Sequence, residues 1–427
     1  MDVDKLLRDR RLKDMEWWCE RMGVDAAQKI ASSVRGEPCE CGYDDEGLAI
    51  REGTFHKCYW VRFADRTRWV VRFPLPSMVS WDMVNNKIET EVATLKFLME
   101  RTSIPVPEVV GYGFNGGDHP TGLPFIILRH VSGFHLSTRW DDLPPEHRHN
   151  VFEQLADILL ELNGHHFDHI GALGLDKSGN WTLSRPPLNS PTSHLKIDGV
   201  EIHMDTVFST SMEFFLAQYD HLWRRYTEQR NSVYHEEDAK EKYVRLQLFK
   251  ELLPTFNVPE FNDGPFTLMH SDLHQSNILV DENLRITAIL DWEWACVLPI
   301  QISGLPPICL SLKRPAEVGP DEYSEWLRSV KSWIKIYERK ESQLAIDIPI
   351  AGLMKESLRD RKFWFAHAIM DPYWFEYIFD DHIYSHTIDV DFDVICSEIL
   401  NAETHSSAKQ LIAQKLRDLE TYNILLL

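Results

Sequence analysis

Residues 270–280 read HSDLHQSNILV, and within eight positions they hold two histidines, an aspartate and an asparagine. If the stretch is a strand, His270, Asp272 and His274 share one face, because strand side chains alternate, and the three could bind zinc. If it is a loop that leads into a strand, the histidines are scaffold, and Asp272 and Asn277 are the working groups. The rest of the sequence distinguishes these two interpretations.

The composition is that of a folded protein with a strongly acidic surface. The chain has 427 residues, 44% of them hydrophobic, which is enough for two or three structural units or for one two-lobed enzyme. Its 66 acidic and 45 basic residues give a formal net charge of -21. Such a surface repels polyanions, so neither nucleic acid nor an anionic membrane is expected as a main partner, and no protein partner is identified.

Cysteine usage and the first residues bear on the compartment. The seven cysteines form no even set of paired motifs, which indicates free thiols in a reducing environment. The residues at the start mix acids and bases without the apolar core of a secretory signal, so we expect a cytoplasmic protein. The uncharged stretch 295–312 contains three prolines and is therefore interpreted as a buried or wall-forming loop and not as a membrane helix.

Local patterns predict a small sheet-containing lobe followed by a large helical one. Residues 50–74 alternate like antiparallel strands, and two more strands are expected before Gly133. Helices are expected at 1–33, 84–99, 145–162, 206–253, 321–343 and 352–425. In the second of these helices Glu91 lies near the apolar stripe, whereas Glu89 lies well off it, so Glu91 is expected to face the sheet. We therefore divide the chain into an N-terminal helical extension (1–49), an N-lobe (50–132) and a helical C-lobe (133–427).

A β-hairpin is expected directly after the quoted stretch. Two short apolar runs, ILV after Asn277 and ITAIL before Asp291, flank the polar connection DENLR. The midpoint of 277 and 291 lies inside this connection, so the two residues are expected to face each other, roughly 4.5 to 5.5 Å apart. Their oxygen atoms suit Mg²⁺ and leave positions for phosphate oxygens. Phosphoryl transfer also needs a carboxylate that takes a proton from the acceptor hydroxyl, and Asp272 is the candidate.

The pattern H-x-D-x-x-x-x-N, followed by a strand and ILDWEWA, resembles the aminoglycoside phosphotransferase and choline kinase family, especially its fungal members. The resemblance runs from about Ile50 to Pro299 and includes IREGTFHKCYWV, RWVVRFPLP, EVATLKFL and IPVPEV. It implies an α+β, two-lobed protein-kinase-like fold, with a small N-terminal lobe of antiparallel sheet plus helix and a larger, mainly helical C-terminal lobe. It also implies a small-molecule kinase that moves the γ-phosphate of ATP to a hydroxyl with the help of Mg²⁺.

The resemblance assigns roles around the quoted stretch. Asp272 would be the catalytic base, and His270 would brace the catalytic loop beside it. Asn277 and Asp291 would hold magnesium, and Glu293 would be a further member of the metal network.

The same resemblance places the nucleotide between the lobes. Gly53 and Thr54 match the turn over the phosphates, and backbone groups in 129–133 would hold adenine. His274 either braces the catalytic loop or approaches the phosphates. Arg72 stands where the family has a phosphate-binding lysine, paired with Glu91. Arginine keeps the charge, but its planar fork has a different reach.

Three alternatives remain open at this level. The arginine at position 72 and the single glycine of the phosphate turn also fit a catalytically impaired nucleotide-binding or scaffold protein. A histidine-based zinc hydrolase would contain bound metal. The run 371–393 combines acids with aromatics, which suits either a cationic acceptor or a solvated acidic face over packed aromatics.

Overall fold

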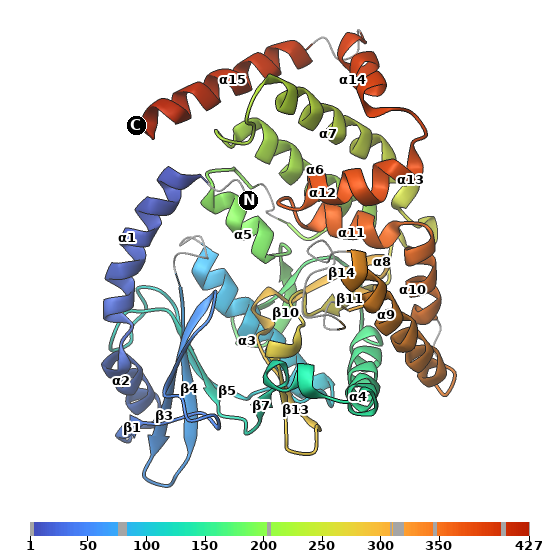
Figure 1. Ribbon diagram of the computed structural model, residues 1–427. Coiled ribbons are helices and arrows are strands. Elements are labelled where there is room, and N and C mark those ends of the chain that lie inside the picture. The colour runs from blue at the N-terminus through green and yellow to red at the C-terminus, as the bar shows by residue number, and fades with distance from the viewer. Residues whose placement is uncertain are drawn as a thin grey trace.

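The computed structural model describes residues 4–75, 83–202, 206–307, 310, 320–344, 348–402 and 407–426 (Figure 1). Parts of the predicted helices at 1–33 and 352–425 and of the predicted loop at 295–312 lie outside the described residues. Within the described chain, a small lobe built on an antiparallel sheet adjoins a larger lobe made mainly of helices. This is the α+β, two-lobed organisation expected from the sequence.

The N-lobe sheet is antiparallel, with strand order β1-β3-β4-β6-β5 and β2 paired to β3. Its strands are β1 (Cys39–Cys41), β2 (Ile50–Glu52), β3 (His56–Phe63), β4 (Arg68–Pro74), β5 (Val109–Gly113) and β6 (Phe125–Arg129). Helix α2 (Val24–Arg35) packs on one face, and helix α3 (Val84–Arg101) packs on the other. Strand alternation explains how β4 serves both faces: Val71 and Phe73 join the core with α2, whereas Arg72 points to the α3 side.

The predicted N-terminal extension is largely part of this lobe. Strand β1 lies in the sheet, and Ala27 and Ile30 of α2 are fully buried against it, so a boundary at residue 49 cuts through one packed unit. Helix α1 (Lys5–Arg21) runs between the lobes along one side of the molecule (Figure 1). At its start the buried Asp4 pairs with Arg230, with the nearest atoms 2.7 Å apart.

The C-lobe is made mainly of helices around one continuous apolar core. Its longer helices are α4 (Pro145–Asn163), α5 (Ser190–Ile197), α6 (Ser211–Glu228), α7 (Glu236–Phe256), α9 (Pro320–Glu341), α10 (Ile350–Arg359), α11 (Lys362–Met370), α14 (Phe392–Asn401) and α15 (Ala408–Leu425). Shorter helices are α8 (Ile300–Ser303), α12 (Phe375–Ile378) and α13 (Ser385–Thr387), with a π-helical turn at Phe379–Tyr384. No described helix has the length and apolar character needed to cross a membrane.

Short strands of the C-lobe flank the loop at residues 270–277. They are β7 (Phe134–His135), β8 (His166–Phe167), β9 (Ala172–Leu175), β10 (Trp181–Arg185), β11 (Phe266–Met269), β12 (Ile278–Val280), β13 (Ile286–Ile289) and β14 (Cys296–Pro299). The prediction of a loop from residue 295 onward is wrong for its first part, because β14 pairs with β11 and α8 comes directly after it. The prediction that this part is buried is confirmed.

The expected hairpin is present, but its register differs by one residue from the prediction. Strand β12 pairs with β13 so that the amide of Leu290 donates to the carbonyl oxygen of Asn277 at 2.8 Å. Asn277 therefore faces Leu290 and not Asp291. In the structure Val280 faces Ile286, so the turn is centred on residue 283 and not on residue 284. A register shift between Leu279 and Val280 then brings Asn277 opposite Leu290.

Candidate active site

The loop between β11 and β12 is held in place by His270. This side chain is 3% exposed; its Nε2 donates to the carbonyl oxygen of Leu290 at 2.7 Å, and its Nδ1 accepts from the amide of Asp272 at 3.3 Å. Burial lowers the pKa of His270 to about 4, so the ring is neutral near pH 7. Both ring nitrogens are used to position the loop, which is the bracing geometry expected for this residue.

The same loop turns the polar groups of Asn277, His274 and Asp272 toward one another. The amide nitrogen of Asn277 donates to the carbonyl oxygen of Asp272 at 3.0 Å and lies 3.3 Å from Nε2 of His274. Nε2 of His274 is in turn 3.8 Å from a carboxylate oxygen of Asp272. Residues 270–274 form a loop and not a strand, and both ring nitrogens of His270 already make hydrogen bonds. His270, Asp272 and His274 therefore do not form the zinc site that a single strand face would have provided.

Arg72 and Glu91 form the ion pair expected between the sheet and helix α3. Nη1 of Arg72 is 2.5 Å from a carboxylate oxygen of Glu91, and both residues are buried. Nη2 of Arg72 also contacts the carboxylate of Asp291 and lies 2.9 Å from Nδ1 of His56. One guanidinium therefore joins the N-lobe sheet, helix α3 and the segment after the hairpin.

A second buried cation, Lys87, has no role in the predictions from sequence. It lies one helical turn before Glu91, is 1% exposed and pairs with the fully buried carboxylate of Glu293. Its ammonium lies 4.7 Å from the ring centre of Trp294. A residue four positions before Glu91 shares its helix face, so the periodicity that selects Glu91 also selects Lys87.

The charges of this buried group shift the pKa values of its members. Burial, with the positive charges of Arg72 and Lys87, lowers the pKa of His56 well below its usual value, so the ring is neutral. Burial raises the pKa of Glu293 well above its usual value. Burial alone would raise the pKa of Asp291, but the nearby cations outweigh it, and the pKa of Asp291 lies below its ordinary value.

Within the described part of the chain, two sets of side chains have the composition of a cation site. His56, Glu91 and Glu293 have ligand atoms within 4.8 Å of one another, but Arg72 and Lys87 already supply positive charge there. Asn277 and Asp291 line a cavity instead, and they offer the amide and carboxylate oxygens that Mg²⁺ prefers.

This cavity, of about 360 Å³, lies between the lobes. Gly53, Thr54, Arg72 and His274 line it, as do Asp272 and the segment around Gly133. Glu91 and Glu293 are buried and do not line this cavity. A Cβ placed on Gly53 would meet only the carbonyl oxygen of His56, at 3.8 Å, so the turn itself does not require glycine.

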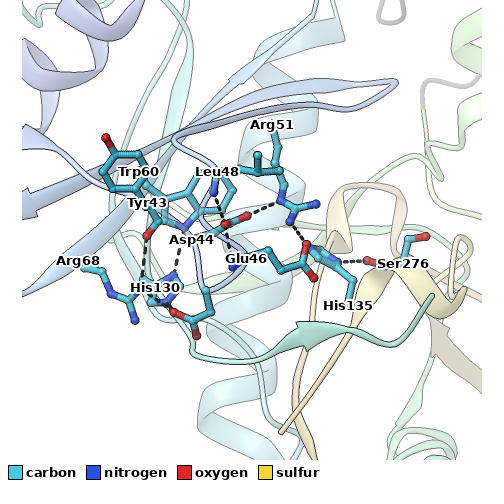
Figure 2. A network of polar contacts seen from close by, with 11 residues as sticks. Tyr43, Asp44, Glu46, Leu48, Arg51, Trp60, Arg68, His130, His135 and Ser276 are labelled. Atoms are coloured by element: carbon cyan, nitrogen blue, oxygen red, sulfur yellow. Dashed lines mark hydrogen bonds and ion pairs between the residues drawn. The ribbon is translucent and has the colours of Figure 1, made fainter. Parts of the chain in front are cut away.

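The loop before β2 forms one wall of the same cavity. Asp45 accepts from the amide of Gly133 at 2.9 Å and from Arg68 at 2.6 Å, and it lies 3.2 Å from His130. Asp44 and Glu46 both hold Arg51 at the edge of the cavity, as Figure 2 shows. The backbone amide of Gly133 already donates a hydrogen bond to Asp45. A nucleotide base would therefore have to bind other backbone groups of residues 129–133. Nothing in the local sequence relates residue 45 to residue 133.

Comparison with known proteins identifies the class. A model described as the phosphotransferase enzyme family matches residues 47–301, and the chain belongs to that family. Its two lobes have the protein-kinase-like architecture expected from the resemblance. Membership supports phosphotransferase activity on a small molecule.

Individual relatives are distant. The chain is 23% identical over 393 residues to a subtelomeric hrmA-associated cluster protein of Aspergillus fumigatus, covering 75% of this chain and 76% of that protein. It is 22% identical over 310 residues to altered inheritance of mitochondria protein 9 of Saccharomyces cerevisiae, covering 60% of this chain and 49% of that protein.

Similar solved structures include a macrolide 2'-phosphotransferase type I, at 15% identity and a TM-score of 0.43, covering 90% of this chain and 99% of that one. Another is an ethanolamine kinase of Plasmodium vivax, at 15% identity and a TM-score of 0.43; the match covers 84% of this chain and 83% of the kinase chain.

Proposed function

We propose that this protein transfers the γ-phosphate of ATP to a hydroxyl group of a small molecule. The observation that carries the proposal is the position of Asp272, which lines two adjoining cavities. One is the cavity between the lobes, with Asn277 and Asp291 in its wall, and we refer to it as the donor cavity. The other, of about 180 Å³, lies within the C-lobe. A single carboxylate therefore stands where a phosphate donor and an alcohol would meet.

Each side chain has a task in this reaction. Asp272 takes the proton of the acceptor hydroxyl, and His270 fixes the backbone amide of Asp272 and with it the direction of the carboxylate. Asn277 and Asp291 would hold Mg²⁺, which neutralises charge on the phosphates when bound. Arg72, oriented by Glu91, supplies a permanent positive charge at the wall of the donor cavity.

The rival function is a nucleotide-binding scaffold without turnover. It is favoured by the contact of Arg72 with Asp291, because a guanidinium bound to a metal ligand competes with the metal. Turnover that depends on Asp272 supports the enzyme, whereas nucleotide binding without any turnover supports the scaffold.

We propose, from the sequence, that the protein is located in the cytoplasm. The yeast relatives are named for mitochondria, so the two compartments are competing expectations. Fractionation of fungal cells that express the tagged chain decides between them: recovery with the cytosolic marker supports the proposal, and recovery with a matrix marker overturns it.

The test of nucleotide binding is thermal unfolding with ATP, with Mg²⁺ and with both. A ligand at 100 times its dissociation constant adds about 2.7 kcal/mol to the free energy of unfolding. We expect this stabilisation to need both ATP and Mg²⁺ and to be lost in Asp291→Asn. Asparagine is chosen because it tolerates the left-handed backbone of this residue, φ 67°. The exposed Asp389→Asn is the control. The absence of any shift in the native protein would refute a loaded nucleotide site.

A further inference from the structure

The C-lobe cavity beside Asp272 has a chemistry of its own. It is lined by residues of α4, α8, α11 and α12 together with the loop that carries Asp272, and Phe55, next to Thr54, lines both this cavity and the donor cavity. Its role rests on the proposed function, because this space would hold the molecule that accepts the phosphate. We refer to it as the acceptor cavity.

The acceptor cavity is mainly apolar. Among the described residues that line it, the carboxylates are Asp272 and Asp371, and none is a lysine or an arginine. Much of its wall is made of aliphatic, thioether and aromatic groups, among them Leu159, Leu268, Leu273, Ile302, Met370 and Trp374. A wall of this kind binds a ligand through burial of apolar surface, with polar groups fixing its orientation.

The acidic run at 371–393 does not surround this cavity with charge. Asp380 binds Arg245 through both carboxylate oxygens, at 2.8 and 3.0 Å from Nε. Glu376 lies 3.5 Å from the ammonium of Lys242. Of the described acids in the run, Asp371 alone is among the residues that line the cavity. A polycationic acceptor would need several carboxylates, because each amine that leaves water requires a partner.

The volume limits the size of the group that enters. The acceptor cavity measures about 180 Å³. An apolar cavity of about 150 Å³ holds a molecule of the size of benzene. The space therefore admits one ring-sized group, and the remainder of a larger molecule would stay outside.

We propose that the acceptor is an uncharged alcohol whose hydroxyl is attached to a ring-sized apolar group. The group fills the acceptor cavity and directs its hydroxyl to Asp272. In the transfer the O–H bond breaks and its proton passes to Asp272, the alcohol oxygen bonds to the γ-phosphorus, and the bond to the bridging oxygen breaks. ADP leaves with that oxygen, and the product is a phosphate monoester.

The experiment compares three alcohols with different charges: 2-phenylethanol, choline and kanamycin. ADP release from MgATP is measured with each, and binding of each is measured by calorimetry without nucleotide. We expect 2-phenylethanol to bind and to give a kcat/KM at least ten times that of either cation. Preference for choline or kanamycin overturns the proposal, as does failure of 2-phenylethanol to bind or to accelerate ADP release.

Two variants test the cavity itself. Ala366 lines it and is 3% exposed, so Ala366→Leu should narrow it and lower kcat/KM for 2-phenylethanol at least tenfold. Met370→Ala should enlarge it and raise kcat/KM for 4-phenyl-1-butanol relative to 2-phenylethanol. Both variants should keep the stabilisation by MgATP, which shows that they fold. Unchanged acceptor kinetics in both variants would place the acceptor elsewhere.

The two proposals fail in different ways. If MgATP neither stabilises the protein nor is consumed, the proposed function fails, and calorimetry with 2-phenylethanol still tests the chemistry of the cavity. If MgATP is bound and hydrolysed but 2-phenylethanol does not bind, the acceptor class is wrong and the phosphotransferase stands.

Discussion

The guanidinium of Arg72 donates a hydrogen bond to the carboxylate of Asp291, although 219 positions separate them in the chain. Arg72 belongs to the N-lobe sheet, and Asp291 lies just after the C-lobe hairpin. The contact therefore links the two lobes at the donor cavity, and it places a cation directly against a predicted magnesium ligand. The buried Glu91 on the other side of Arg72 makes the same cation necessary for the fold.

Removal of the charge of Arg72 should destabilise the protein strongly. Arg72→Met leaves the carboxylate of Glu91 buried without its partner, which costs about 3 to 5 kcal/mol of unfolding free energy. Arg62→Met is the matched control on the adjacent strand β3, because Arg62 is 55% exposed and its pair with Glu40 is worth about 0 to 1 kcal/mol. Urea denaturation measures both, and equal costs would contradict the role of Arg72.

Lys87 and Glu293 should behave as one unit. Lys87→Met leaves the buried carboxyl group of Glu293 without its partner, and Glu293→Leu leaves the buried ammonium of Lys87 without its partner, so each change should cost about 3 kcal/mol. The double variant replaces the pair by apolar groups, so we expect it to be more stable than either single variant. Denaturation of the four proteins gives the coupling energy, and additive costs would show that the two side chains act separately.

The stability of the protein should fall with acid through His270. The pKa of His270 is about 4 in the folded protein and 6.5 in the absence of burial, so its contribution is complete above pH 6.5. It is lost progressively as the pH falls from about 6.5 to about 4, because the unfolded chain then binds the proton first, and the loss amounts to roughly 3 kcal/mol. His270→Gln should flatten this part of the pH profile. The exposed His169→Gln should not, and an unchanged slope in His270→Gln would contradict the neutral, buried ring.

Two glycines at the donor cavity should respond differently to alanine. Gly133 has φ 152°, and a Cβ there would lie 2.7 Å from Oγ1 of Thr287, so Gly133→Ala should cost about 1 to 3 kcal/mol of stability. Gly53→Ala meets no close atom and should change stability by no more than about 0.5 kcal/mol. If the phosphates approach this turn, KM for ATP should rise in Gly53→Ala. An unchanged KM would assign Gly53 to an ordinary turn.

Much of the candidate site could be predicted because its residues are close in sequence or share one helix. The loop at 270–277 and the hairpin after it can be inferred from local spacing. The helical stripe correctly places Glu91 on the face toward the sheet, where the family resemblance pairs it with Arg72. The hairpin register is wrong by one residue because neither the centre of the turn, at residue 283, nor the shift between Leu279 and Val280 leaves a mark in the pattern of apolar residues.

Other parts depend on contacts between distant segments. Asp45 reaches the amide of Gly133 across 88 positions, and no propensity or periodicity encodes such a pairing. The inclusion of α2 and β1 in the N-lobe is likewise a matter of tertiary packing. Lys87 is different, since the helix periodicity that selects Glu91 was sufficient to find it.

The central claim is that Asp272 is the base of a phosphate transfer. The most direct measurement is ADP release from MgATP, with and without 2-phenylethanol, by the native protein, Asp272→Asn and the control Asp389→Asn. We predict that Asp272→Asn loses turnover by a factor of about 10² to 10⁴ while its stabilisation by MgATP persists, and that the control is unchanged. Equal turnover in the native protein and Asp272→Asn, or no turnover in either, would contradict the account.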